Sequence, residues 1–130
     1  MSLNYKGYNF VIFDVEEKLS SGAYFIITEN DNEIYATMVK DINFSLIAKE
    51  NYNYEIYLAK GNLFSVIDKI KSGTLNRFKL CTFKTNNYED LFNDNIKMNF
   101  SKFDCKEGLY LSNPVIKFDK KFLDSFIDNL

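Results

Sequence analysis

The N-terminal half of the chain carries apolar runs whose spacing is typical of β-strands. Phe10–Val15 is apolar on both faces until Asp14, which predicts a central strand. Ala23–Thr28 and Ile34–Val39 are two further apolar runs separated by the polar stretch Glu29–Glu33, and together they predict a β-hairpin. Ile42–Leu46 alternates between apolar and polar residues, as expected for a half-buried strand.

The periodicity then changes from that of a strand to that of a helix. Tyr52–Leu58 alternates like a strand, whereas Leu63, Val66, Ile67 and Ile70 are spaced as the apolar stripe of a helix. Asn62 can cap the N-terminus of this helix, and Gly73 follows its last turn. We therefore predict a helix over about 62–72 that docks on a sheet, because a helix this short is marginal alone.

The C-terminal half predicts further strands and a second helix. Asp119 can cap a terminal helix over about 119–129, whose apolar face is formed by residues three or four positions apart. Pro114 interrupts an extended stretch and favours an edge position. The other predicted elements are strands at Phe78–Phe83, Ile96–Phe100 and Leu109–Leu111, and one or two helical turns at Tyr88–Asn93.

These elements predict one α+β domain spanning residues 1–130, because no linker or low-complexity tract divides the chain. We expect a mainly antiparallel meander sheet of roughly six to eight strands, with the middle helix and the C-terminal helix packed on it. Residues 56–70 resemble residues 116–130, and both are strand-then-helix units. We interpret this similarity as a shared amphipathic pattern, with an internal duplication as the alternative.

The composition removes several kinds of catalytic and metal site. The 130 residues include no His, and Arg77 is the only Arg. The absence of His excludes Ser-His-Asp triads, Cys-His dyads and His-based metal sites, and the single Arg nearly excludes bidentate phosphate clamps. The isolated glycines form no phosphate-binding loop. We therefore expect no enzyme activity, no catalytic residues, no cofactor and no bound metal.

The charge balance argues against nucleic acid as a partner. The net charge is -2 and the pI is about 5.2, which does not suit a protein that neutralises many phosphates. The N-terminal residues lack the features of a signal peptide, and no apolar run could cross a membrane. These observations predict a cytoplasmic protein that contacts neither nucleic acid nor membrane.

The two cysteines do not define a site. Cys81 is expected in a strand and Cys105 in a polar loop beside Lys106, which makes Cys105 the better nucleophile candidate. No His is present to act as its base, so a catalytic cysteine is not expected. Whether the two thiols are bridged is left open by the sequence.

Carboxylates form two clusters along the chain. Asp14, Glu16 and Glu17 follow the first strand, and Glu29, Asp31 and Glu33 lie at the hairpin tip. If the two clusters were adjacent, they could bind a divalent cation or a basic protein surface, but solvated loops explain them as well. Asp14 shares a strand face with Phe10 and Ile12, so it is expected to be partly buried and to need a partner.

Tyrosine and asparagine are concentrated in one segment, which contains Tyr52, Tyr54 and Tyr57 together with Asn51 and Asn53. Such segments recur at protein interfaces, because Tyr combines a large contact area with a polar tip. The alternative is a half-exposed strand in an aromatic-rich protein.

The favoured function is a non-catalytic protein-binding module, in concrete form a small inhibitor or immunity-type protein that occludes a partner's active site. The expected partner-binding residues are Glu29, Asp31, Glu33, Tyr52, Tyr54 and Tyr57, and the expected partner is a toxin or defence effector. The alternatives are a phage or mobile-element anti-defence protein and a small-ligand-binding domain. The sequence does not distinguish a monomer from a homodimer.

Overall fold

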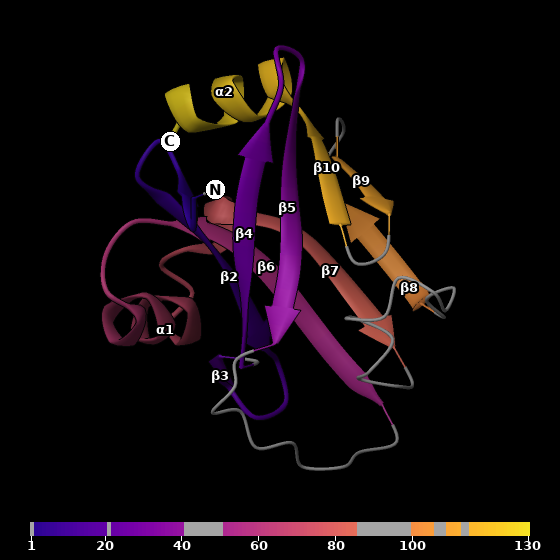
Figure 1. Cartoon of the computed structure of the whole chain (residues 1–130). Coiled ribbons are helices and arrows are strands. Elements are labelled where there is room, and N and C mark those ends of the chain that lie inside the picture. The colour runs from indigo at the N-terminus through magenta and orange to yellow at the C-terminus, as the bar shows by residue number, and fades with distance from the viewer. Residues whose placement is uncertain (1, 21, 41–50, 86–99, 106–108, 113–114) are drawn as a thin grey trace.

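The computed structural model describes residues 2–20, 22–40, 51–85, 100–105, 109–112 and 115–130. These residues form two antiparallel sheets and two helices (Figure 1). The predicted α+β class, the antiparallel pairing, the middle helix and the C-terminal helix are thus confirmed. The predictions for Ile42–Leu46, Tyr88–Asn93 and Pro114, and most of that for Ile96–Phe100, lie outside the described residues.

Within the described residues, the larger sheet contains six strands. Its main path runs in the order β1-β2-β6-β7-β8, and β3 pairs with β2 at the end of β2 away from β1. The strands are β1 (Asn4–Tyr5), β2 (Tyr8–Asp14), β3 (Leu19–Ser20), β6 (Tyr52–Ala59), β7 (Lys79–Thr85) and β8 (Phe100–Cys105). We call it the large sheet.

The second sheet, here called the small sheet, has four strands among the described residues, in the order β4-β5-β10-β9. They are β4 (Ala23–Glu29), β5 (Glu33–Lys40), β9 (Leu109–Ser112) and β10 (Val115–Asp119). The predicted hairpin is confirmed as β4 and β5. The strands therefore do not form one meander sheet. Each sheet has an apolar face, and the two faces are buried by packing against each other.

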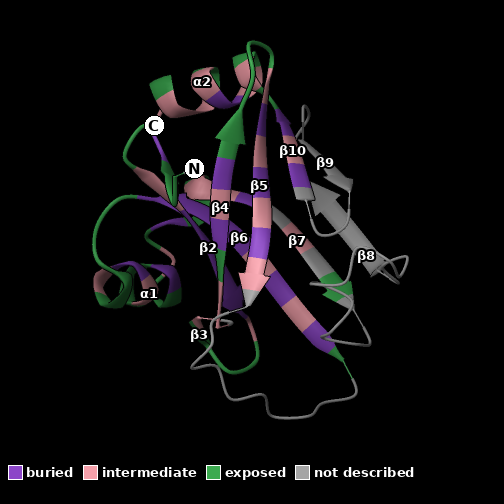
Figure 2. Ribbon diagram, viewed as in Figure 1, coloured by how far each residue is buried: buried purple, intermediate pink, exposed green. Residues whose placement is uncertain are grey.

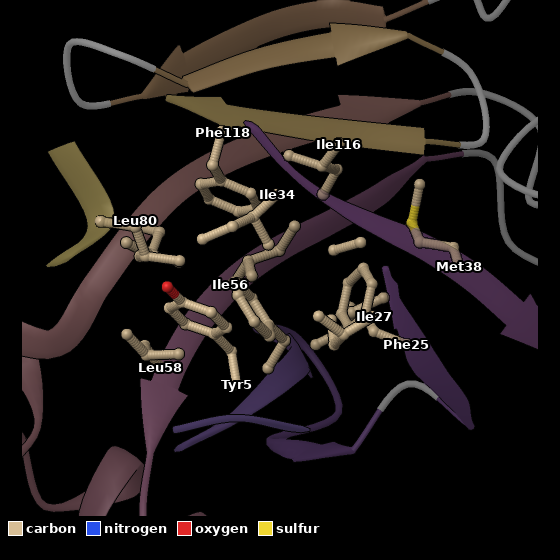
Figure 3. Packing of buried hydrophobic residues seen from close by; sticks show 14 of the residues in the cluster. Tyr5, Phe25, Ile27, Ile34, Met38, Ile56, Leu58, Leu80, Ile116 and Phe118 are labelled. Atoms are coloured by element: carbon tan, nitrogen blue, oxygen red, sulfur yellow. The ribbon is translucent and has the colours of Figure 1, made fainter. Parts of the chain in front are cut away.

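One core lies between the two sheets. It contains Phe10, Ile12 and Ile56 from the large sheet, together with Phe25 and Phe118 from the small sheet. Figure 3 shows Ile56 of the large sheet and Phe25 and Phe118 of the small sheet pointing into this core. The ring of Phe10 lies 5.8 Å from that of Phe25 and 5.2 Å from that of Phe118, so aromatic contacts link the sheets directly.

The helix α1 (Leu63–Lys71) covers the outer face of the large sheet, where it forms a second apolar cluster. Val66 and Ile70 of α1 pack with Val11, Phe13 and Tyr57 of the sheet. This cover explains why β2 is buried on both faces, as the apolar pattern of Phe10–Val15 predicted (Figure 2). It also explains why the C-terminal half of β6 is buried continuously rather than alternately.

Local signals define both ends of α1 as predicted. The side chain of Asn62 accepts a hydrogen bond from the Ser65 N–H at 2.9 Å. After the helix, the Gly73 N–H donates to the Ile70 carbonyl and the Thr74 N–H to the Lys69 carbonyl. Gly73 has a φ of 79°, so these bonds form a Schellman motif whose left-handed position favours glycine.

The helix α2 (Lys120–Asp128) follows β10 without a linker and lies across one end of the two sheets (Figure 1). The carboxylate of Asp119 caps it by accepting from the N–H groups of Lys121 and Phe122. Leu123 is its fully buried residue, whereas the aligned Leu63 is half exposed at the start of α1. The two strand-helix units are therefore packed differently, which favours a shared amphipathic pattern over a duplication.

Candidate docking surface

The hairpin tip carries the three carboxylates that the sequence singled out, but two of them form ion pairs within the chain. Glu29 lies 3.0 Å from the ammonium of Lys120, and Glu33 lies 2.7 Å from that of Lys117. Both lysines lie close to the hairpin tip because β10 pairs with β5. This pairing places Glu33 opposite Asp119. Asp31 is exposed, and no cation among the described residues pairs with it. The tip therefore presents less free negative charge than its sequence indicates.

The three predicted tyrosines are buried rather than exposed. Tyr52 and Tyr54 lie in the core between the sheets, and Tyr57 lies under α1. The exposed fraction of Tyr54 is 1%. Burial raises the pKa of the Tyr57 phenol well above its ordinary value, and the hydrogen bond to Glu55 raises it further. The three tyrosines are therefore not at the surface. They do not form one site with the acidic tip.

The two acidic clusters lie at opposite ends of β4. β3 pairs with β2 at Asp14 and is the strand before β4 in the chain. The hairpin tip follows the other end of β4 (Figure 1). β4 has seven residues, which separate the clusters by about 20 Å at about 3.3 Å per residue. Among the described residues, no group of three or more His, Cys, Asp or Glu could hold a metal ion.

Asp14 is buried, with an exposed fraction of 6%, as its strand position predicted. Its Oδ1 accepts hydrogen bonds from the N–H groups of Glu16 and Glu17 at 3.1 and 3.2 Å. The carboxylate therefore closes the loop after β2.

Cys105 does not lie in a polar loop. It lies in β8, where its backbone pairs with that of Cys81 in β7. The apparent polarity of the Cys105 region came from Asp104 and Lys106; of these, Asp104 lies within β8, where it pairs with Thr82 of β7. The prediction that Cys105 lies in a loop is therefore wrong, and a loop position no longer supports it as a nucleophile candidate.

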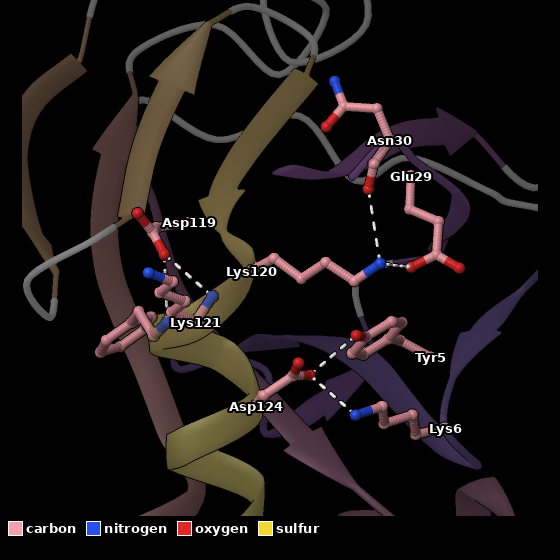
Figure 4. A network of polar contacts seen from close by, with 9 residues as sticks. Tyr5, Lys6, Glu29, Asn30, Asp119, Lys120, Lys121 and Asp124 are labelled. Atoms are coloured by element: carbon pink, nitrogen blue, oxygen red, sulfur yellow. Dashed lines mark hydrogen bonds and ion pairs between the residues drawn. The ribbon is translucent and has the colours of Figure 1, made fainter. Parts of the chain in front are cut away.

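A polar network joins α2 to the N-terminal strand (Figure 4). The Tyr5 hydroxyl donates to Asp124 at 2.7 Å, and the Lys6 ammonium lies 3.0 Å from the same carboxylate. Burial acts to raise the pKa of Asp124, but the hydrogen bonds from Tyr5 and Lys6 outweigh it and lower that pKa. Burial, followed by the bond to Asp124, raises the pKa of Tyr5.

An open polar cleft of about 860 Å³ lies beside this network. Lys6 and Lys120 line it, and each already faces a carboxylate, Asp124 and Glu29 respectively. An incoming anion would have to compete with both carboxylates. The arrangement therefore serves best to hold α2 against β1 and β4.

A different surface combines exposed apolar side chains with a cavity. The cavity has a volume of about 260 Å³ and lies where β2, β4 and the start of α1 approach one another. Leu3, Tyr24 and Leu63 line it and are all exposed, so it opens to solvent. Phe64 follows Leu63 and is 86% exposed. We call Leu3, Tyr24, Leu63 and Phe64, together with this cavity, the apolar opening.

The apolar opening could be read only partly from the sequence. The helical stripe placed Leu63 among the buried residues, but this residue is the first of α1 and is 50% exposed. The available signal was Phe64, a large apolar residue one position off the stripe. Leu3 carried no recognisable signal because its position depends on pairing far along the chain.

Comparison with protein-family models, with curated proteins and with solved structures finds no match for this chain. In the part of the chain that the structure describes, neither helix is long and apolar enough to cross a membrane. Functional inference therefore depends on the surface itself.

Proposed function

We propose that this protein is a non-catalytic module that binds another protein through the apolar opening, and that it acts as a small inhibitor of that partner. The observation that carries the proposal is the gathering of the exposed side chains of Leu3, Tyr24 and Leu63 at one cavity; Phe64, the next residue after Leu63, is exposed as well. Exposed apolar side chains clustered at a cavity are the usual centre of a protein interface.

The cavity is large enough to receive a side chain from a partner protein. Its volume is about 260 Å³. A cavity of about 150 Å³ suffices for benzene. The apolar opening therefore suits one large apolar side chain supplied by a partner.

Affinity capture from an extract of the cells that encode the protein tests this function. The baits are the wild-type chain, the double variant Leu63→Ser/Phe64→Ser, and Tyr35→Ala as a matched control at the far end of β5. The variant Asp31→Lys tests the acidic tip separately. A captured partner is then purified, and its Kd for each variant is measured by calorimetry.

We expect stoichiometric capture by the wild type and by Tyr35→Ala, and at least about tenfold weaker binding by Leu63→Ser/Phe64→Ser, since central apolar anchors contribute most of the energy of an interface. The proposal fails if no protein is retained stoichiometrically, or if the double variant binds as tightly as the wild type. Loss of binding only in Asp31→Lys would assign the interface to the hairpin tip instead.

A further inference from the structure

Cys81 and Cys105 lie directly opposite each other in neighbouring antiparallel strands, although they are far apart in the chain. Cys81 belongs to β7 and Cys105 is the last residue of β8, and the register pairs the two residues. This register continues without a shift as far as Lys84 and Lys102. The backbone pairing therefore determines how closely the two cysteines approach each other.

The hydrogen-bonding pattern of the large sheet shows which kind of pair the two cysteines form. The Val15 N–H donates to the Asn53 carbonyl, so the backbone groups of Asn53 point toward β2. Because this direction reverses at each residue of a strand, the backbone groups of Ile56 point the other way, toward β7. Ile56 pairs with Cys81, so the N–H and C=O of Cys81 point toward β6 and away from β8. Cys81 and Cys105 are therefore a non-hydrogen-bonded pair.

A non-hydrogen-bonded pair is the closer of the two kinds of pair in an antiparallel sheet. Its Cα atoms lie about 4.5 Å apart, against about 5.5 Å in a hydrogen-bonded pair, and its two residues share one face of the sheet. A disulfide bond requires Cα atoms that are about 4.4–6.8 Å apart. The register of β7 and β8 thus meets the Cα distance that a bridge between these cysteines requires.

We propose that Cys81 and Cys105 form a cross-strand disulfide that closes and opens with the redox state of the thiols and disulfides around the protein. β8 ends the path of the large sheet, and β7 is its neighbour among the described residues. The bridge therefore fixes this end strand covalently to the rest of the sheet. β6 and β7 separate β8 from β2, and this inference does not rest on the proposed function.

Exchange with a small-molecule disulfide closes the bridge. The thiolate of one cysteine attacks a sulfur of the small disulfide, forms a mixed disulfide and releases one small thiolate. The thiolate of the second cysteine then attacks the cysteine sulfur of the mixed disulfide and releases the other small thiolate. The two protons lost by the cysteines go to the two released thiolates. Two protein thiols are thus oxidised while one small disulfide is reduced, and the reverse exchange opens the bridge.

Oxidised and reduced glutathione are the probe for this inference. The full chain is equilibrated with the two at a series of ratios, the remaining thiols are alkylated, and the peptides are mapped by mass spectrometry. We expect a peptide that joins Cys81 to Cys105 within one chain. We also expect the equilibrium constant for closure to be at least about tenfold larger in the folded protein than in urea, because strand pairing already brings the two residues together.

Several results of this measurement would overturn the inference. They are free thiols in excess oxidised glutathione, mixed disulfides that persist on either cysteine, and bridges that join two chains. An equal equilibrium constant in urea would also overturn it, because the bridge would then not depend on the pairing of β7 with β8.

A variant that moves one thiol by one residue gives the matched comparison. Cys105→Ser/Asp104→Cys keeps two cysteines in the chain, but residue 104 lies on the opposite face of β8 from residue 105. We expect this variant to form no bridge to Cys81 under conditions that close the bridge in the wild type. Equally ready closure in the variant would show that the register does not determine the bridge. The wild-type peptide map tests the inference even if the variant does not fold.

The bridge is also expected to change the thermal stability of the protein. It closes the loop of residues 81–105 in the unfolded chain and so lowers the entropy of the unfolded state. We expect the oxidised wild type to melt about 5–10 °C above the reduced wild type, and Cys81→Ser to melt at the same temperature under both conditions. An unchanged or lower melting temperature of the oxidised wild type would show that the strands must shift to form the bridge, against the inference.

Discussion

Single polar side chains hold the irregular parts of this fold in place. Asn30 closes the tip of the β4–β5 hairpin by accepting from the N–H groups of Asn32 and Glu33, and Asp14 closes the loop after β2 in the same way. The burial of Asp14 followed from its place in an alternating strand. The role of Asn30 was hidden by the neighbouring acids, because side-chain amides and carboxylates are equally common at turns.

Asp124 is expected to make the stability of the protein sensitive to acid. Its pKa is lowered in the folded state, so its contribution is present above the ordinary aspartate pKa of about 3.9 and is lost as the pH falls through the lowered value. Solvent screens this partly exposed pair, so the contribution is about 1 kcal/mol or less. Urea unfolding of wild type and Asp124→Asn should show a difference at neutral pH that shrinks in acid. A constant difference would contradict the prediction.

Tyr57 is expected to make the stability of the protein sensitive to alkaline pH. Its pKa is raised by burial and by its hydrogen bond to Glu55, so the neutral phenol stabilises the fold below the unfolded tyrosine pKa of about 10. This stability is lost as the pH rises beyond that value. Tyr57→Phe, which cannot ionise, should therefore lose less stability than the wild type between about pH 9 and pH 11. Equal losses in denaturant titrations would show that Tyr57 does not contribute.

Elements were easier to predict than the faces that they bury. Capping residues and the helical period placed both helices within a residue or so at each end. Alternation correctly predicted Tyr52–Leu58 as a strand, but it cannot tell which face meets the core. Tyr52 and Tyr54 face the other sheet, while Tyr57 faces α1, so a segment that resembled an interface is buried on both sides.

Alanine substitutions at the two ends of α1 are expected to lower the stability of the protein more than an alanine substitution at an exposed position within the helix. Gly73→Ala puts a Cβ at a φ of 79°, and Asn62→Ala removes the cap of the N-terminus. Each should cost about 1 kcal/mol of unfolding free energy. Lys69→Ala, at an exposed position within the helix, is the control and should change stability by less than about 0.5 kcal/mol. Chemical unfolding of the three variants checks these values, and similar effects in all three would contradict them.

At the scale of the whole molecule, the division into two sheets could not be predicted from the sequence. β2 pairs with β6 and β5 pairs with β10, so strands distant in the chain become neighbours. Apolar alternation carries no information about which strand lies beside which. For the same reason the sequence indicates only part of the apolar opening, because its cavity forms only where β2, β4 and α1 meet.

The shared core predicts a large contrast between two phenylalanines. Phe118 has no exposed surface, whereas Phe64 is 86% exposed. Phe118→Ala should lower the unfolding free energy by about 3–5 kcal/mol through lost burial and a cavity between the sheets. Phe64→Ala should change it by less than about 0.5 kcal/mol. Comparable destabilisation by the two variants, measured by urea unfolding, would show that Phe64 serves packing rather than docking.

The pairing of β5 with β10 also determines when the protein can fold during its synthesis. The β4–β5 hairpin can form early, but a two-stranded ribbon is marginal alone. Its apolar face remains without the rest of its sheet until residue 119 has left the ribosome. A nascent chain must therefore carry an exposed hydrophobic hairpin from the synthesis of β5 until that of β10, and chaperones that recognise such surfaces have this interval in which to bind it.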